Sequence, residues 1–260
     1  MVYLREMKLG RLREIFRGLE SAVVTFSGGV DSSLLVKIAR DELGDRAVAL
    51  TAKSSALAAS EFDDARRVAE SVGIRHVVLN YEETDNADYA ANPSNRCYFC
   101  KNMLYKRARE FADANGFRHV VNGFNVDDVR DDRPGQIAAA EFGIRSPLFE
   151  ASLTKAEIRA ISQSLGLPTF DKPEMACLAS RIPHGEPVTI GKLNTVERAE
   201  AYIRGLGFRQ LRVRHHGRRA RVEVEPADIS RAAARIRDIE AHLKLLGFDH
   251  VDLRGYSRAK

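Results

Sequence analysis

The chain has 260 residues, 44% of them hydrophobic and 30% charged, which is enough for one large or two unequal domains. It contains no apolar run long enough to cross a membrane, and its charged first residues are not typical of a signal peptide, so we expect a soluble, cytoplasmic protein with no membrane partner. The net charge of +5 is uneven, because residues 181–260 hold 17 Lys and Arg against 10 Asp and Glu, and this part is therefore expected to bind an anion.

The first predicted strand, residues 23–26, leads into a glycine-rich loop, and apolar residues with helical spacing follow it. A strand, a tight loop and a helix start form a cradle for phosphate, because glycines let backbone amides approach and the helix N-terminus favours negative charge. A Walker-type loop would end in Gly-Lys-Ser/Thr, but no lysine follows these glycines before Lys37. The loop is predicted to bind pyrophosphate and, through the Asp31 carboxylate, Mg²⁺; its candidates are Ser27, Gly28, Gly29, Asp31, Ser32 and Ser33.

Strands and helices then alternate. Strands are predicted at 47–52, 74–79 and 119–122, and helices at 62–72, from about 101 to 116, and at 154–166. Capping boxes are predicted at residues 60–63 and 154–157. This order predicts an α/β fold with a doubly wound parallel sheet that binds ligands at the carboxyl ends of its strands. The loops there supply further nucleotide-binding candidates: Thr51, Lys53, Ser54, Gly123, Asn125 and Asp128.

The pattern changes near residue 183, which predicts two domains, residues 1–182 and 183–260. The second reads as a small α+β unit of the order αββαβ, with helices at about 191–204 and 226–245. Its hairpin, 211–224, alternates apolar residues with arginines, so Arg212 and Arg214 share the polar face. Clustered arginines repel one another unless an anion lies among them, and we expect these two to bind a substrate phosphate. An ordinary half-solvated sheet is the alternative; RNA is less favoured because the hairpin lacks interleaved aromatic residues.

Three cysteines, an odd number, argue against a disulfide framework and for free or metal-bound thiols. Cys97 and Cys100 form a Cys-x-x-Cys pair that is expected just before the helix starting near residue 101, and Cys177 follows later. Three thiolates suit a [4Fe-4S] cluster with one open iron. Zinc with His184 or His76 as fourth ligand, and small buried cysteines with no metal, are the alternatives.

The Ser-Gly-Gly-Val-Asp-Ser-Ser loop resembles that of the PP-loop ATP pyrophosphatases, a group that cleaves ATP between its α- and β-phosphates to form an adenylate. Five further segments of the chain, given below, also match one family within this group, and they occur in the same order. The segment 176–183 is the most specific of them. Together they resemble the LarE family, the sulfur transferases that mature the nickel-pincer cofactor of lactate racemase. The segments are 122–128, 133–135 (Arg133-Pro-Gly), 146–148, 176–183 (Ala-Cys-Leu-Ala-Ser-Arg-Ile-Pro) and 252–256.

The resemblance implies that ATP adenylates a carboxylate of pyridinium-3,5-biscarboxylic acid mononucleotide and that sulfur then displaces AMP. Family members with the Ala-Cys-Leu cysteine alone sacrifice its sulfur, whereas those with an added Cys-x-x-Cys resemble cluster-dependent tRNA thiolases. Cys97, Cys100 and Cys177 match the second pattern, so a catalytic enzyme carrying sulfide on a cluster is predicted, with sacrifice of Cys177 as the alternative. Arg181 is expected to neutralise the substrate carboxylate, and Arg212 and Arg214 to bind the mononucleotide phosphate.

The expected partners are a sulfide donor, further copies of this chain in a homo-oligomer, and a nickel-insertion protein that receives the product. The main rival is a tRNA thiolase with the same loop and cluster, although no dedicated RNA-binding appendage is evident. A synthetase of the amidotransferase type is weaker, because the chain has no glutaminase domain. A non-catalytic nucleotide sensor on the same scaffold is the rival from a different class.

Overall fold

The computed structural model describes residues 2–130 and 134–256, so Arg133 of the predicted Arg-Pro-Gly motif lies outside the described residues. The chain divides into two compact units, Met1–Glu83 with Asn95–Met175, and Thr84–Ser94 with Ala176–Lys260. The sequence boundary at residues 182 and 183 lies a few residues beyond the start of the second unit at Ala176, and it did not anticipate the segment Thr84–Ser94. Within the described chain, no helix is both long and apolar enough to cross a membrane.

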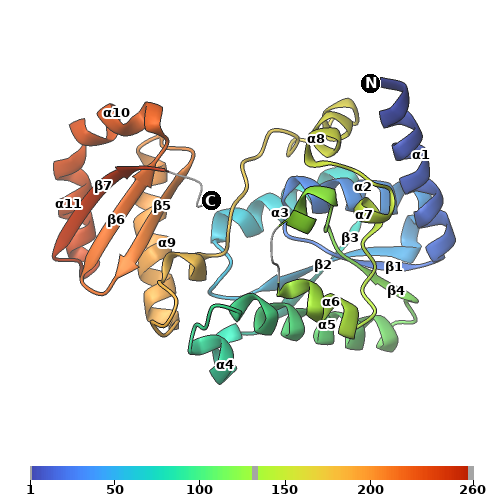
Figure 1. The fold of residues 1–260 in the computed structure, drawn as a ribbon, viewed down its shortest axis with the longest axis horizontal. Helices are drawn as coiled ribbons and strands as arrows, with labels where there is room; N and C mark the ends of the chain where they lie inside the picture. The colour runs from blue at the N-terminus through green and yellow to red at the C-terminus, as the bar shows by residue number, and fades with distance from the viewer. Residues whose placement is uncertain (1, 131–133, 257–260) are drawn as a thin grey trace. The chain divides into compact units, whose positions relative to one another are not determined.

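The first unit contains a four-stranded sheet in the order β3-β2-β1-β4 (Figure 1). All neighbouring pairs are parallel, and Val24 lies opposite Ala49 on one side and Val121 on the other. This confirms the predicted α/β fold with a parallel sheet. Because β1 is flanked by β2 on one side and β4 on the other, the chain reverses its winding direction there, and the carboxyl ends of β1 and β4 form the switch point where such folds bind ligands. The strands are β1 (Ala22–Thr25), β2 (Ala47–Lys53), β3 (Arg75–Asn80) and β4 (His119–Val121).

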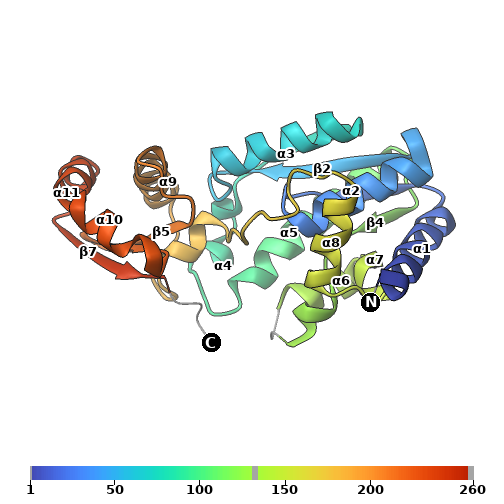
Figure 2. The same cartoon turned by 90° about the horizontal axis from the view of Figure 1, so that it is seen from above.

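Helices cover both faces of this sheet. One face packs against α1 (Val2–Leu19), α2 (Val30–Leu43), α3 (Ala59–Val72) and α8 (Lys155–Ser164). The other packs against α5 (Arg96–Ala114) and α6 (Gly135–Glu141), which lie below the sheet in Figure 1 and are seen from above in Figure 2. The short helix α7 (Pro147–Glu150) also belongs to this unit, whereas the short helix α4 (Ala87–Ala90) lies in the segment that belongs to the second unit.

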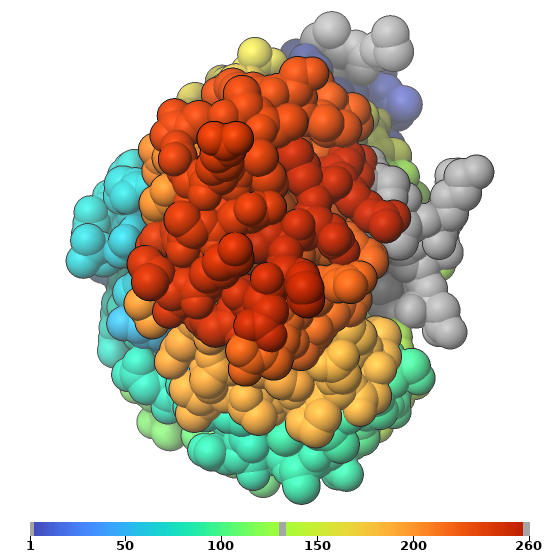
Figure 3. Space-filling view, turned by 90° about the vertical axis from the view of Figure 1, so that its left-hand side faces the viewer, coloured from blue at the N-terminus to red at the C-terminus, as the bar shows by residue number. Residues whose placement is uncertain are grey.

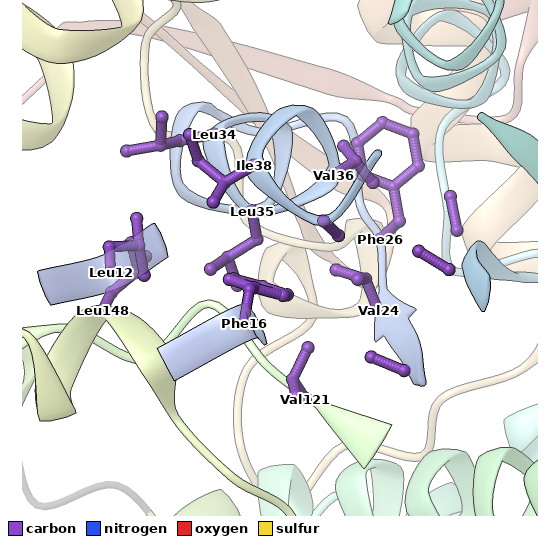
Figure 4. Packing of buried hydrophobic residues seen from close by; sticks show 14 of the residues in the cluster. Leu12, Phe16, Val24, Phe26, Leu34, Leu35, Val36, Ile38, Val121 and Leu148 are labelled. Carbon is purple, nitrogen blue, oxygen red and sulfur yellow. The ribbon is translucent and has the colours of Figure 1, made fainter. Parts of the chain in front are cut away.

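Alternation along β1 sends successive side chains into different cores. Val23 joins the cluster under α5, and Val24 joins the cluster formed by α1 and α2. In Figure 4, Phe16 of α1 and Leu35 of α2 pack beside Val24, and all three are fully buried. The loop between β1 and α2 therefore starts and ends on elements anchored in the core.

The helix starts test the sequence signals directly. Thr154 and Glu157 form the predicted capping box at the start of α8, each side chain accepting from the backbone N–H of the other. The box predicted at residues 60–63 is wrong: α3 begins at Ala59, which places Ser60 inside the helix, and Ala58 at the cap has no side-chain acceptor. The expected helix start near residue 101 is also wrong, because α5 begins at Arg96.

The second unit has a three-stranded sheet in the order β5-β6-β7, in which β5 and β6 are antiparallel and β6 and β7 parallel. Its elements are α9 (Ile190–Gly205), β5 (Leu211–His216), β6 (Arg219–Val224), α10 (Ile229–Ala234), α11 (Ile236–Leu245) and β7 (His250–Gly255), which follow the predicted αββαβ order except that two helices stand in place of the second one. The single helix expected at about 226–245 is wrong, because Arg235 at φ −106° and ψ 9° separates α10 from α11. Figure 3 views this unit, orange to red, from the side of α11.

The segment Thr84–Ser94 belongs to the second unit because buried Asn92 binds it there. The Asn92 amide donates to the carbonyls of Pro183 at 2.7 Å and Glu186 at 2.8 Å. The backbone adds hydrogen bonds from Gly185 to Asn92 and from Val188 to Ala90. These contacts join parts of the chain about ninety positions apart, which is why no local sequence pattern revealed them.

Candidate active site

The predicted phosphate loop connects β1 to α2, and its serine hydroxyls hold it closed. The backbone N–H of Ser27 donates to Ser32 Oγ at 3.3 Å, and the two serine hydroxyls lie 3.2 Å apart. Ser32 Oγ also lies within donating distance of the Gly29 carbonyl, at 3.2 Å. These contacts connect the two ends of the loop to one another.

Gly28 and Gly29 have different tasks. Gly28 adopts φ +72°, and a Cβ there would lie 2.9 Å from the backbone of Ala65 on α3, so only glycine fits. Gly29 is the N-cap of α2, and no side chain of the described residues caps that helix end. Its first amides are therefore available to an anion. Ser33 Oγ is buried and has no hydrogen-bond partner among the described residues.

Asp31, in the first turn of α2, carries the carboxylate predicted to bind Mg²⁺. It forms an ion pair with Lys155, and Asn125 Nδ2 lies 3.5 Å from its Oδ1. Burial raises the pKa of Asp31, Lys155 lowers it in part, and Asp128 and Glu174 raise it further. Carboxylate and amide oxygens are ligands that suit Mg²⁺, and the ammonium group of Lys155 already occupies the place of a cation on this carboxylate.

The loop after β4 meets the phosphate loop, as the switch point of the sheet requires. A Cβ on Gly123 would lie 3.2 Å from Asp31 Cβ and 3.4 Å from the Ser32 nitrogen. Asn125 is fully buried, and its backbone N–H donates to Asp128 Oδ2 at 3.1 Å. The structure thus brings Gly123 and Asn125 to Asp31, with Asp128 bracing the turn that holds them.

The three nucleotide-binding candidates at the end of β2, Thr51, Lys53 and Ser54, contact other groups of the protein. The buried Thr51 hydroxyl donates to the Phe26 carbonyl at 2.7 Å and lies 2.8 Å from His76 Nε2. Lys53 Nζ lies 4.6 Å from the centre of the Phe62 ring, and Ser54 Oγ accepts from the Ala56 N–H at 3.2 Å. Thr51 therefore connects β2 to the start of the phosphate loop. His76, proposed as a zinc ligand in one alternative, is engaged with Thr51, and its pKa is lowered chiefly by burial.

Two lysines that the sequence reading missed contact this loop. Lys155 is the first residue of α8, and its Nζ also lies 3.3 Å from Glu174 Oε1. Lys172 Nζ donates to the Gly28 carbonyl at 3.2 Å and lies 3.0 Å from Glu61 and 2.8 Å from Asp64. Lys155 lies inside the capping box predicted at residues 154–157. That local pattern gives no sign that the lysine contacts Asp31, which is distant in the sequence.

The three cysteines are free thiols divided between the units. Cys97 and Cys100 lie within the first turns of α5, three residues apart and hence on one helical face. Cys97 and Cys177 are exposed and Cys100 is half-buried, so solvent reaches the thiols. Thiolates of this kind suit iron–sulfur clusters and zinc. Within the described residues, no group of three or more His, Cys, Asp or Glu side chains is arranged to hold a metal ion.

Arg181 is almost fully buried, and its guanidinium contacts protein groups. Its Nε donates to Glu200 Oε1 at 2.7 Å and its Nη1 to the Ala176 carbonyl at 2.7 Å and the Cys177 carbonyl at 3.2 Å. The sequence placed Arg181 against the substrate carboxylate. In the structure it fastens the Cys177 segment to α9.

Arg212 and Arg214 follow one another on the polar face of β5, as predicted. Arg214 donates to Glu223 at 3.1 Å and to the Ser180 carbonyl at 2.9 Å. Arg212 stacks 4.6 Å from the centre of the Tyr256 ring and forms no ion pair within residues 2–130 and 134–256. The pKa of Arg212 is lowered, chiefly by burial; Tyr256 acts against this, and the nearby cations Arg181 and Arg214 lower the pKa further. Tyr256 is the last residue of segment 252–256, for which the sequence indicated no role.

Comparison with known proteins agrees with this geometry. Residues 16–96, which include the phosphate loop, match the asparagine synthase family, which supports the use of ATP. An uncharacterised protein of Synechocystis sp. is 46% identical over 98% of this chain and 97% of its own length. A tRNA-specific 2-thiouridylase MnmA of Parvibaculum lavamentivorans is 30% identical, but over 65% of this chain and 51% of the relative.

A further relative links the site to a named activity. The pyridinium-3,5-bisthiocarboxylic acid mononucleotide synthase of Lactiplantibacillus plantarum is 36% identical over 254 residues, covering 96% of this chain and 91% of the relative. Identity of this extent spans both units, the phosphate loop, the Cys177 segment and β5 alike. The chain therefore belongs to the LarE family of the PP-loop superfamily.

Proposed function

We propose that this protein is an ATP-dependent, AMP-forming sulfur transferase that converts the carboxylates of pyridinium-3,5-biscarboxylic acid mononucleotide to thiocarboxylates in nickel-pincer cofactor synthesis. The near full-length match to the synthase of L. plantarum carries this proposal. The phosphate loop of the first unit supports it, since that loop suits a leaving pyrophosphate.

Activation of the carboxylate is the task of the residues around Asp31. A carboxylate is a poor electrophile, and transfer of AMP gives it a good leaving group. The free amides at the N-terminus of α2, with Gly28 and Gly29 allowing close approach, stabilise the pyrophosphate that departs. Asp31 would hold Mg²⁺, with Asn125 beside it, and the metal would neutralise phosphate charge. We assign ATP binding to residues 1–182.

Recognition of the mononucleotide is assigned to the second unit. Arg212 is half-buried and positively charged, and Tyr256 braces it from one side. Arg214 lies on the same face but is already held by Glu223 and Ser180, so it positions the strand and adds charge. A phosphate monoester fits this arrangement because guanidinium groups bind its oxygens in pairs. Residues 183–260 are the domain to which we assign substrate phosphate binding and oligomerisation.

The sulfur source is the second half of the proposal. A [4Fe-4S] cluster held by Cys97, Cys100 and Cys177 would supply the sulfide that displaces AMP. The accessibility of the thiols and their number support this assignment. Arg181 contributes by holding the carbonyl of Cys177, which limits the movement of that thiol. Loss of sulfur from Cys177 itself, and zinc in place of iron, are the alternatives; anaerobic purification with iron, sulfide and zinc analysis separates them.

The experiment that tests the function supplies the purified protein with Mg–ATP, a sulfide donor and the pyridinium dicarboxylate mononucleotide, and follows thiocarboxylate formation by mass spectrometry. We expect thiocarboxylate to form, and total tRNA neither to compete nor to gain sulfur. Thiolation of tRNA without reaction of the pyridinium compound would favour the tRNA thiolase, to which the resemblance is more distant and covers less of the chain. A product handed to a nickel-insertion protein completes the proposed role.

A further inference from the structure

The phosphate loop has no lysine of its own, yet the fold brings one to it from more than a hundred residues away. Lys155 is the first residue of α8, and its ammonium group pairs with the Asp31 carboxylate. Its backbone is held firmly, since its N–H donates to Asp127 Oδ2 at 2.7 Å and the Thr154–Glu157 box closes the helix start. The backbone is thus anchored, while the long side chain is 22% exposed.

The charges around Lys155 bear on whether its ion pair with Asp31 persists when ATP binds. Lys155 lies between the carboxylates of Asp31 and Glu174. Burial is the main cause that raises the pKa of Asp31; Lys155 lowers it in part, and Asp128 and Glu174 add smaller increases, so Lys155 is one cation among three carboxylates where a polyphosphate must enter. A cation on Asp31 is required in either state, and Mg²⁺ delivered with ATP carries more charge than an ammonium group. Once the metal takes the Asp31 carboxylate, Lys155 loses the closer of its two carboxylate partners and keeps only Glu174, 3.3 Å away, at a site that has just gained phosphate oxygens.

Resting on the proposed use of ATP, we propose that Lys155 is an exchanging cation that pairs with Asp31 in the free protein and moves to the β- or γ-phosphate when Mg–ATP binds. It then does the work of the lysine in a Walker-type loop. No bond is made or broken in this exchange, which is a rotation of one side chain between two anionic partners.

Lys172 shows by contrast what a fixed lysine looks like. Its Nζ lies between two carboxylates, Glu61 and Asp64, and donates to the Gly28 carbonyl. The side chain is 13% exposed, against 22% for Lys155. Arrival of Mg²⁺ at Asp31 removes none of the partners of Lys172, so it stays and fastens the loop to α3.

The test measures binding of Mg–ATP, Mg–pyrophosphate and AMP by calorimetry, with no pyridinium substrate present. Lys155→Gln should weaken ATP and pyrophosphate binding at least about tenfold, the loss typical of one charge-assisted contact, and change AMP binding less than about twofold. Lys155→Arg keeps the charge and should recover most of the affinity. Lys8→Gln is the matched control, because Lys8 pairs with Glu157 in the same turn of α8 at 21% and 22% exposure but away from the loop.

Unchanged or tighter binding of ATP and pyrophosphate by Lys155→Gln would overturn the inference, since it would mean that Lys155 merely shields Asp31 from the metal. An equal loss of affinity for ATP, pyrophosphate and AMP would also overturn it, because it would indicate general damage to the site. Thermal unfolding of each variant is measured alongside to detect such damage. If the unaltered protein binds no ATP, the proposed function fails together with the inference. Normal thiocarboxylate formation and unchanged ATP binding in Lys155→Gln would remove the inference alone.

Discussion

Single residues decide whether the phosphate loop can exist. Gly28 carries two constraints at once, a positive φ and the backbone of Ala65 at 2.9 Å from any Cβ, whereas Gly73 has a similar φ of +70° and open space around it. The sequence predicted the glycines from the chemistry of phosphate binding. The structure shows that Gly28 is required by the fold as well.

Gly28→Ala should therefore destabilise the protein by more than the about 1–2 kcal/mol that left-handed backbone costs an L-residue, because the neighbouring α3 backbone must also shift. It should also weaken ATP binding severely. Urea unfolding and calorimetry measure both effects. Gly73→Ala is the control for backbone strain alone, because Gly73 is left-handed at φ +70° and ψ 30° with open space around it. If Gly28→Ala loses no more stability than Gly73→Ala and still binds ATP, the contact with Ala65 is unimportant.

Asp31 shows a conflict between stability and function at one side chain. Its pKa in the folded protein lies above the usual 3.8, with burial as the main cause, so ionised Asp31 destabilises the fold. That cost is absent at pH values below 3.8, grows as the pH rises from 3.8 to the raised pKa, and is complete once the pH has passed the raised pKa.

Asp31→Asn should raise the melting temperature at pH 7, by about 2–4 °C for each kcal/mol recovered, while abolishing Mg²⁺-dependent ATP binding. The gain should vanish in acid, where both proteins are uncharged at this position. Calorimetric melting curves across this pH range provide the check. Asp45→Asn, which alters an aspartate 98% exposed, should show no such profile, and a gain for Asp31→Asn that persists in acid would contradict the assignment.

At the scale of elements, a buried network joins the Cys177 segment to α9 and β5. Arg181 bridges the carbonyls of Ala176 and Cys177 to Glu200, and Glu200 Oε1 also accepts from the Val213 N–H at 3.0 Å. The ion pair is 1% and 2% exposed. The strand that bears Arg212 and Arg214 is thereby tied to the segment that bears the thiol.

Glu200→Gln should cost about 3–5 kcal/mol of unfolding free energy, because it leaves the guanidinium buried without its counter-charge. Urea denaturation gives the value. The exposed pair of Arg218 with Asp249 supplies the comparison, and Asp249→Asn should have no measurable effect. A similarly small effect for Glu200→Gln would show that this ion pair does not hold the two elements together.

Elements were predictable to different degrees, for reasons visible in these contacts. The apolar runs predicted β1, β2 and β4 because most of their residues are buried, and they also predicted β3, an edge strand whose central residues are half-buried. The Thr154–Glu157 box predicted the start of α8 because both partners lie within one turn. The start of α5 at Arg96 and the break at Arg235 carry no comparable local signal. Lys155, Glu200 and Asn92 could not be found from sequence, since each acts on a residue distant in the chain or inside a packed core.

For the whole molecule, the division of the cysteines matters most. Cys97 and Cys100 belong to one unit and Cys177 to the other, so a cluster would need thiols from both. A sacrificial mechanism needs Cys177 alone. The cluster mechanism therefore requires Cys97 and Cys100 of the first unit, whereas the sacrificial mechanism requires neither.

Cys97→Ala should abolish repeated turnover and lower the iron content of anaerobically purified protein, because one of the three thiolate ligands is lost. Thiocarboxylate formed per chain, measured with excess sulfide, reports the turnover. Undiminished repeated turnover in this variant would exclude the cluster assignment, and a single equivalent of product in both proteins, with loss of sulfur from Cys177, would favour the sacrificial mechanism.

The central claim is that a carboxylate of the substrate is activated by AMP at the phosphate loop. The most direct measurement supplies ATP labelled at its α-phosphate together with the pyridinium dicarboxylate mononucleotide and identifies the labelled nucleotide released. We predict labelled AMP and an equal amount of pyrophosphate. Release of ADP and inorganic phosphate would contradict the account.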